Sequence, residues 1–197
     1  MSYLWRFVLC LFLCISIQLP TLADESKFER SHSQKIVGYT TDVLLIGMPL
    51  ATLTGVLIEH DWKGLVQGTY TAALTTGVTL LLKYTVKEER PDHSNFHSFP
   101  SGHSATTFAT AAFVQRRYGW KLGAPAYALA AYTGWGRVFA KKHHWWDVVA
   151  GAAIGSGSAY LFTRPWAVEH QVNITPMTMT DPVTETPFFG VSASFSL

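Results

Sequence analysis

Three short stretches of the sequence combine basic residues, histidines and a carboxylate at defined spacings. Guanidinium groups hold phosphate oxygens in a bidentate manner, and a lysine adds a compact positive charge. Two arginines, a lysine and two histidines in one pocket would repel one another unless an anion were bound among them. The pattern therefore predicts an oxyanion site. The three stretches are Lys83-x6-Arg90-Pro91, Pro100-Ser101-Gly102-His103 and Arg137-x5-His143-x3-Asp147.

The second stretch stands at the start of an apolar segment, where a helix is expected. The first turn of a helix offers unpaired backbone N–H groups and the positive end of the helix dipole, which together bind anions. Gly102 allows the backbone to approach a ligand closely. We therefore predict that Ser101 and Gly102 bind phosphate together with Lys83, Arg90 and Arg137.

The two histidines and the aspartate are suited to covalent catalysis. His143 and Asp147 are four residues apart and therefore share one face of a helical turn. A carboxylate that accepts the proton of one imidazole nitrogen leaves the other nitrogen free to attack phosphorus. His103 comes from a different helix end and can protonate the departing oxygen. We predict His143 as the nucleophile, Asp147 as its orienting carboxylate and His103 as the general acid and base.

A metal site is the chemical alternative. Imidazoles and carboxylates also bind zinc or manganese, and several such residues lie within the same stretches. Two arginines and a lysine in the same pocket would repel a dication, so we predict neither a metal nor another cofactor. The candidate ligands of this alternative are Asp92, His93, His97, His103, His143 and Asp147.

The elements that must position these residues are apolar segments of helical length. Their richness in Ala, Leu and Thr favours helices over strands. In an alternating bundle, the helix ends that carry the three stretches fall on one side. The predicted fold is therefore all-α, a bundle of five to six helices with the site at one end. The segments are residues 39–58, 64–86, 103–117, 122–140 and 146–163. Gly151 and Gly155 form a small-xxx-small face for close helix packing.

The composition points towards a membrane. The chain of 197 residues is 48% hydrophobic and only 14% charged, with a mean hydropathy of +0.16. The apolar segments approach the roughly 20 residues that cross a bilayer. The 115–121 loop carries Arg116, Arg117 and Lys121, which favours a cytoplasmic position. We expect an inner-membrane protein with its site facing the periplasm; a soluble periplasmic bundle remains the alternative.

The two ends of the chain differ from this helical part. Residues 1–23 contain Arg6 and an apolar run, typical of a signal peptide or, alternatively, of an uncleaved first transmembrane helix. Residues 24–38 are expected to form a polar linker, 39–165 the helical domain and 166–197 a flexible tail, although its last residues alternate with a strand-like period. Both cysteines, Cys10 and Cys14, lie in the first segment, which excludes a disulfide framework and a cysteine-rich zinc site.

The three stretches resemble the signature of a known family. That signature is Lys-x6-Arg-Pro, Pro-Ser-Gly-His and Ser-Arg-x5-His-x3-Asp of the type 2 phosphatidic acid phosphatases, whose fold is shared by bacterial class A acid phosphatases and vanadium haloperoxidases. All three parts occur in order over residues 83–147, and the flanking helices extend the resemblance to about 39–163. Small bacterial membrane lipid phosphatases are the nearest type. The resemblance implies a metal-independent phosphatase that acts through a phosphohistidine.

The implied substrate is a lipid phosphate or diphosphate. Polyprenyl diphosphate, phosphatidylglycerol phosphate, phosphatidate and lipid A phosphates are all candidates. A soluble, broad-specificity periplasmic acid phosphatase, a vanadium haloperoxidase and a phosphate-lipid binding module are the alternatives. The expected partners are the lipid and the membrane. The net charge of +2, without a basic run interleaved with aromatics, speaks against nucleic acid, and no protein partner is predicted.

One position departs from the signature. Gly136 replaces the serine expected before Arg137, which removes one hydroxyl donor to the phosphate and should weaken that contact by about 1 kcal/mol. Gly136 could also ease the approach of the backbone, so it is kept as a candidate site residue.

Other residues of the same regions have simpler interpretations. His144, Trp145 and Trp146 are typical of an aromatic belt at a membrane interface. His93 and His97 are expected to be solvated loop residues, and His32, His60 and His170 surface residues.

Overall fold

The computed structural model describes residues 29–166, 172–180 and 187–195. The chain forms two compact units, a helical unit that ends at Thr163 and a C-terminal unit that follows it. The predicted signal peptide at 1–23, both cysteines and His170 lie outside the described residues.

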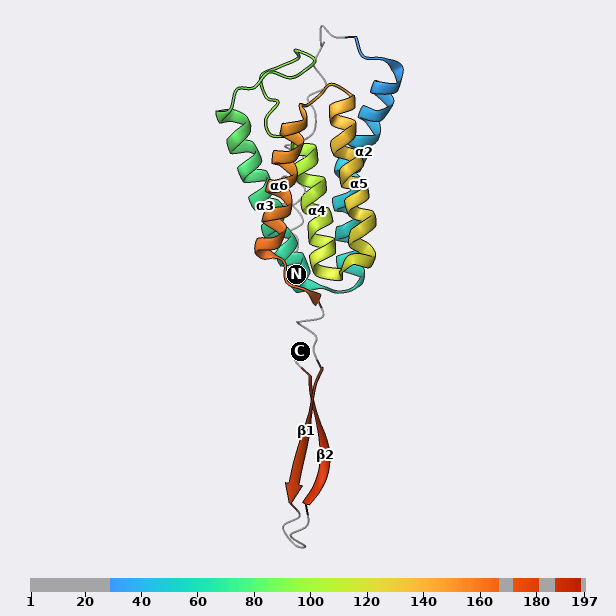
Figure 1. Cartoon of the computed structure of the whole chain (residues 1–197), viewed down its shortest axis with the longest axis vertical. Coiled ribbons are helices and arrows are strands. Elements are labelled where there is room, and N and C mark those ends of the chain that lie inside the picture. Colours follow the sequence, from blue (N-terminus) through green and yellow to red (C-terminus); the bar gives the residue numbers. More distant parts are fainter. Residues whose placement is uncertain (1–28, 167–171, 181–186, 196–197) are drawn as a thin grey trace. The chain divides into compact units, whose positions relative to one another are not determined.

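The helical unit is a bundle in which α4 packs against each of the other described helices. Figure 1 shows α4 between α5 and α6, with α3 on the outer side of α6. The all-α prediction is confirmed for this unit, and the predicted segments agree with the observed helices to within a few residues, except at the start of α2. The helices are α2 His32–Ile58, α3 Trp62–Thr85, α4 Gly102–Tyr118, α5 Trp120–Phe139 and α6 Trp145–Phe162.

Helix α2 begins earlier than the apolar pattern predicts. Ser31 and Gln34 form a capping box: the Ser31 hydroxyl accepts from the Gln34 N–H at 3.3 Å, and the Gln34 side chain accepts from the Ser31 N–H at 3.0 Å. The Gln34 amide also donates to the carbonyl of Phe139 at 3.1 Å. Residues 32–38, assigned above to a polar linker, are therefore the first turns of α2, because capping starts the helix before its apolar face begins.

Helices α4 and α6 touch through their backbones. A Cβ added at Gly151 would lie 2.5 Å from the carbonyl oxygen of Ser101, and one added at Gly155 would lie 2.1 Å from that of Ala105. The small-residue face predicted for α6 is thus confirmed. The close packing also brings the two helix starts together, where the Ser101 N–H donates to the carbonyl of Asp147 at 3.0 Å.

A buried ion pair closes the opposite end of the bundle. Arg117 donates to both carboxylate oxygens of Asp61, at 2.7 and 2.6 Å, and the Tyr118 hydroxyl and the Gly64 N–H also donate to this carboxylate. Burial raises the pKa of Asp61, but these donors outweigh it and hold the pKa below its usual value. Arg117, counted above among the cytoplasmic loop cations, is instead only 1% exposed and joins α4 to the α2–α3 connection.

The outer surface of α2 is apolar. Tyr39, Val43, Ile46 and Leu50 are exposed large apolar residues, and their spacing places them on one helical face. Helices α2 and α3 are both long and apolar enough to cross a membrane. These features support the expected membrane setting.

The C-terminal unit contains two strands, which the all-α prediction does not include. β1, Val172–Thr180, and β2, Pro187–Phe195, pair antiparallel, with Val172 opposite Phe195 and Thr180 opposite Pro187. The period of two in the last residues of the sequence corresponds to β2. β1 was not predicted; it lies within the segment expected to be a flexible tail, and its pairing with β2 defines it.

Candidate active site at the helix ends

The predicted site residues come from neighbouring helix ends. The 86–101 loop, the start of α4, the end of α5 and the α5–α6 connection all lie at one end of the bundle (Figure 1). Lys83, in the last turn of α3, donates to the carbonyls of His97 at 3.0 Å and Pro100 at 3.1 Å. An ammonium group has three donors, so Lys83 can hold the loop and still reach an anion.

The start of α4 is built around Ser101. Its hydroxyl accepts from the N–H of Ser104 at 3.4 Å and from the Ser104 hydroxyl at 3.1 Å, so it caps the helix. Ser101, Gly102 and His103 are all buried. Because α4 begins at Gly102, its first-turn N–H groups lie at this end of the bundle, where the helix dipole favours an anion.

His143 lies in the α5–α6 connection and is paired with Asp147. It is 2% exposed, and its Nδ1 is 3.4 Å from Oδ2 of Asp147. That carboxylate is fully buried; its Oδ2 also accepts from the hydroxyl of Ser98 at 2.5 Å and from the N–H of His144 at 2.9 Å. The orientation leaves Nε2 of His143 as the nitrogen that faces away from the carboxylate. Ser98 was missed by the sequence analysis, which offers no signal for it beyond its position in the loop.

The surroundings keep the His143 imidazole neutral. Burial holds its pKa well below the usual value, and the positive charges of Arg137, Arg90 and Lys83 lower it further, while the Asp147 carboxylate, 3.4 Å away, acts in the opposite direction. A neutral imidazole has a lone pair available on one nitrogen, which nucleophilic attack requires.

Arg137 and His103 converge on a residue that the motifs do not contain. Oδ1 of Asp42, on α2, lies 2.7 Å from a terminal guanidinium nitrogen of Arg137 and 2.8 Å from Nε2 of His103. The same guanidinium nitrogen is 3.3 Å from the hydroxyl of Thr41. The sequence does contain a signal for Asp42, because it is the only charged residue between Ile36 and Ile58. An ionisable residue in such an apolar helix is a functional candidate.

The replacement of serine by Gly136 has a structural reason. A Cβ at this position would lie 2.6 Å from Cγ2 of Thr41 and 3.0 Å from Cγ1 of Val37. Glycine therefore allows α2 to pack directly on the end of α5. A role of Gly136 at the phosphate stays a prediction.

The two imidazoles share charged neighbours. Arg137 and Arg90 lie close enough to act electrostatically on both His103 and His143. His93 and His97 are exposed: His93 pairs with Glu89 at 2.9 Å, and the His97 ring lies edge-on to that of Tyr84. These two histidines behave as the solvated loop residues expected above.

Asp92 anchors the loop that carries Arg90. Its buried carboxylate accepts from Arg30 and from the N–H of Ser94, and Lys142 lies 3.9 Å away. Burial raises the pKa of Asp92, but the hydrogen bonds from Ser94 and Arg30 outweigh it and lower the pKa overall. Burial and the charge of Arg30 lower the pKa of Lys142 to about 8. Asp92 therefore has partners that explain its position without a metal.

A second acidic and histidine cluster lies at the rim. One ligand atom each of Glu88, His144 and Asp147 lies within 4.8 Å of the others, a spacing that could hold a metal ion. Glu88 already accepts from the indole of Trp146 at 2.6 Å, and the His144 ring stacks on the same indole at 4.5 Å. Trp145 and Trp146 are exposed. Their exposure is compatible with an interfacial aromatic belt, which stays a prediction.

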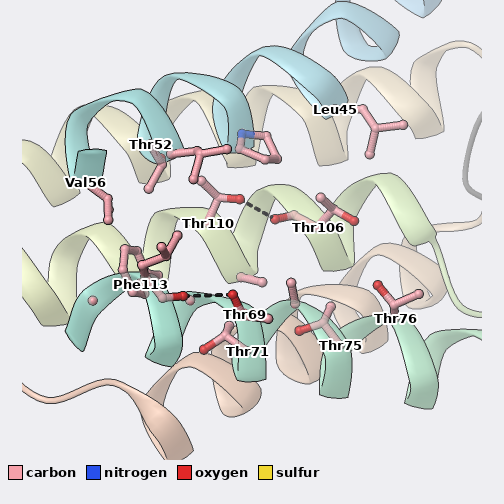
Figure 2. A pocket seen from close by; sticks show the side chains of 17 residues that line it. Leu45, Thr52, Val56, Thr69, Thr71, Thr75, Thr76, Thr106, Thr110 and Phe113 are labelled. Atoms are coloured by element: carbon pink, nitrogen blue, oxygen red, sulfur yellow. Dashed lines mark hydrogen bonds between the residues drawn. The ribbon is translucent and has the colours of Figure 1, made fainter. Parts of the chain in front are cut away.

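A groove begins one helical turn below the pocket, between α2, α3 and α4. It encloses about 110 Å³ and is lined by apolar and threonine side chains. Leu45 and Thr106, which line its upper part, follow Asp42 and His103 by three residues each. Figure 2 shows the threonines of α3 and α4 facing this space, which continues to Phe113.

The helical unit is a bundle with several cationic side chains and two buried histidines at one end. The PAP2 superfamily matches residues 64–169. A lipid A 4'-phosphatase of Helicobacter pylori is 33% identical over 164 residues, covering 78% of this chain and 81% of that protein. The chain belongs to the PAP2 superfamily, and the family resemblance stated above is confirmed.

Further relatives are similar over smaller shares or in fold. A lipid A 1-phosphatase of Porphyromonas gingivalis is 36% identical over 101 residues; this match covers 49% of the present chain but only 23% of that longer protein. The crystal structure of Aquifex aeolicus LpxE has a TM-score of 0.59 and 20% identity, and the match covers 77% of this chain and 92% of that one. This likeness concerns the fold.

Proposed function

We propose that this chain removes phosphate from a lipid A-type glycolipid through a phosphohistidine on His143. The observation that carries the proposal is the buried His143, whose Nδ1 lies against the Asp147 carboxylate beside a group of cationic side chains. The curated names of the relatives, which are lipid A phosphatases, favour this substrate over the other lipid phosphates.

In the first step, the substrate phosphate binds among Arg137, Arg90 and Lys83. Nε2 of His143 forms a bond to phosphorus while the bond to the sugar oxygen breaks, and its electron pair stays on that oxygen. A proton from the imidazolium of His103 neutralises the leaving oxygen. The three cations stabilise the charge on the equatorial oxygens.

In the second step, water hydrolyses the phosphohistidine. His103, neutral after the first step, takes a proton from the water while the water oxygen bonds to phosphorus. The phosphorus–nitrogen bond breaks, and inorganic phosphate leaves. Asp147 keeps the proton on Nδ1 of His143 and thereby restores the same tautomer for the next cycle.

The lipid part of the proposal rests on the surfaces around the pocket. The apolar outer face of α2 suits a bilayer, and the groove between α2, α3 and α4 offers space for an acyl chain of a bound lipid. Arg116 and Lys121 lie at the opposite end of the bundle, which favours the cytoplasm for that end. The pocket would then face the periplasm from a bacterial inner membrane.

The test uses the full chain in detergent with two substrates, lipid A and p-nitrophenyl phosphate, and measures phosphate release. We expect turnover of lipid A, loss of at least about 10³-fold in kcat for His143→Asn, and near-normal kcat for His93→Asn, which changes an exposed histidine of the 86–101 loop. Orthovanadate should inhibit, and a chelator should have little effect. Turnover by His143→Asn would refute the assigned nucleophile.

The same assay tests the lipid assignment. A chain that hydrolyses p-nitrophenyl phosphate but not lipid A, and that stays in the aqueous fraction without detergent, would instead be a soluble acid phosphatase. A groove-filling variant, Thr110→Phe, should raise KM for lipid A and leave KM for the soluble substrate within about twofold. Equal effects on both substrates would remove the groove from the proposal.

A further inference from the structure

We propose that Asp42 is a positioning residue that holds His103 as the proton donor and Arg137 as a phosphate ligand. This inference rests on the proposed function and extends it to a residue outside the three motifs. It gives each histidine of the pocket its own carboxylate: Asp147 for His143 and Asp42 for His103.

The contacts of Asp42 are short and shared by one oxygen. Oδ1 accepts from Nε2 of His103 at 2.8 Å and from Arg137 at 2.7 Å. His103 and Arg137 are only 8% and 5% exposed, whereas the Asp42 side chain is 37% exposed. Asp42 therefore lies at the edge of the pocket and fixes two buried groups behind it. Charge-assisted hydrogen bonds of this length are among the stronger polar contacts in proteins.

The orientation assigns the two nitrogens of His103. Because Nε2–H donates to Asp42, Nδ1 is the nitrogen left for the leaving oxygen. A proton donor must carry a proton there, so His103 must become an imidazolium. The charged groups that face it are Asp42 on α2, Arg137 on α5 and Arg90 on the 86–101 loop. Burial and both arginines oppose protonation of His103, and Asp42 is the one of its three charged neighbours that favours it.

The proton balance follows from this arrangement. When the sugar oxygen leaves, the proton on Nδ1 of His103 moves to it, and the imidazolium becomes neutral while Nε2–H stays bonded to Asp42. When water attacks the phosphohistidine, Nδ1 accepts a proton again. Asp42 itself gains or loses no proton in either step.

The packing of α2 supports the same role. Asp42 reaches the pocket because Gly136 lets α2 approach α5, with Thr41 directly against the glycine. The serine of the family signature would occupy this space. The chain therefore lacks the hydroxyl donor of the signature. In its place, α2 packs closely on α5 and brings the carboxylate of Asp42 to the pocket.

A different role for Asp42 is that of a stand-in for the substrate. Its carboxylate could occupy the place of phosphate on Arg137 and be displaced on binding. The two roles predict opposite kinetics. Loss of a stand-in lowers KM and leaves kcat unchanged, whereas loss of the positioning residue lowers kcat, most of all where the leaving group needs a proton.

The experiment compares Asp42→Asn with wild type on lipid A, whose leaving group is a sugar hydroxyl, and on p-nitrophenyl phosphate, whose leaving group is stable as an anion. We expect kcat/KM for lipid A, which covers the steps up to departure of the sugar oxygen, to fall about 10²- to 10³-fold and kcat/KM for the aryl phosphate to fall less than about tenfold. Asp42→Glu should restore part of the lipid A rate. Glu59→Gln, which removes an exposed carboxylate at the other end of α2, is the matched control and should resemble wild type.

Three results would overturn the inference. Equal losses on both substrates would give Asp42 a purely structural role, and a lower KM with unchanged kcat would make it a stand-in for phosphate. If wild type hydrolyses only soluble phosphates, glucosamine phosphate replaces lipid A and the comparison still separates the roles. A wild-type chain inactive on every phosphomonoester would overturn the proposed function and this inference with it.

Discussion

Adding a single methyl group at Gly136 tests how closely α2 must pack on α5. In Gly136→Ala, the new Cβ would lie 2.6 Å from Cγ2 of Thr41 and 3.0 Å from Cγ1 of Val37. Thr41 is fully buried and β-branched, so its rotamer has little freedom to change within a helix. We therefore expect α2 to shift away from α5 and to carry Asp42 away from Arg137.

The magnitude combines two opposing effects. Overpacking of a tight contact costs about 1–3 kcal/mol, whereas replacing glycine by alanine within a helix contributes about 1 kcal/mol in favour of folding. Gly136→Ala should therefore lose roughly 0–2 kcal/mol of stability. Thr41→Ser removes only the clashing Cγ2 and keeps the hydroxyl that accepts from Arg137, so alanine at position 136 should be tolerated in that background. The coupling energy should be about 1–3 kcal/mol.

The assay is thermal unfolding in detergent of wild type, both single variants and the double variant, with phosphatase rates measured in parallel. One kcal/mol corresponds to about 2–4 °C in a chain of this size. Gly157→Ala is the matched control, because its Cβ would meet no atom within 4 Å, and it should be neutral or slightly stabilising. Strict additivity of Gly136→Ala and Thr41→Ser, or an undiminished rate in Gly136→Ala, would refute the reasoning.

Three further predictions concern other contacts. Gly155→Ala should lower the free energy of unfolding by at least about 3 kcal/mol and lower the Tm accordingly. Its Cβ would be 2.1 Å from the backbone oxygen of Ala105, which cannot move aside. An unchanged melting curve would contradict this prediction. Asp61→Asn should lower the free energy of unfolding by about 3–5 kcal/mol, since it leaves Arg117 buried without its counter-charge. The folded variant should keep its kcat at low temperature. A Tm equal to that of wild type would contradict this prediction. The His143 ring should stay neutral from pH 7.5 to below 6.5 in ¹⁵N NMR, with its signal identified by His143→Asn. In the unfolded chain the His143 ring gains a proton near pH 6.5, whereas in the folded protein it does so only at lower pH. The free energy of unfolding should therefore decrease as the pH falls below about 6.5. Titration of the folded ring near pH 6.5 would disprove this prediction.

The parts of the site that sequence could predict depend on short-range spacing. The four-residue separation of His143 and Asp147 and the glycine before His103 are local patterns, and helix geometry converts them into positions. The helices were predictable because apolar segments of about 15–23 residues, joined by short polar connections, are too long for typical strands. The contacts of Gly151 and Gly155 with α4 follow from the same local regularity.

The remaining parts depend on which helices pack together. Asp42 is 61 residues from His103 and 95 from Arg137, so no local spacing links them. Arg117 resembles an ordinary loop cation until Asp61 is placed beside it. The early start of α2 depends on the side chains of Ser31 and Gln34, which compete with the polar composition of that stretch. β1 lacks a regular apolar alternation and is defined by its pairing with β2.

Helix α4 joins two chemically distinct ends of the bundle. His103 stands in its first turn and Arg117 in its last, about 21 Å apart along the axis at 1.5 Å per residue. The bidentate clamp of Arg117 on Asp61 therefore limits longitudinal sliding of α4, and with it the depth at which the His103 imidazole sits. A substitution at the Arg117–Asp61 pair that allowed α4 to slide would consequently impair catalysis by shifting the proton donor along the axis of α4, although every reacting group would still be present.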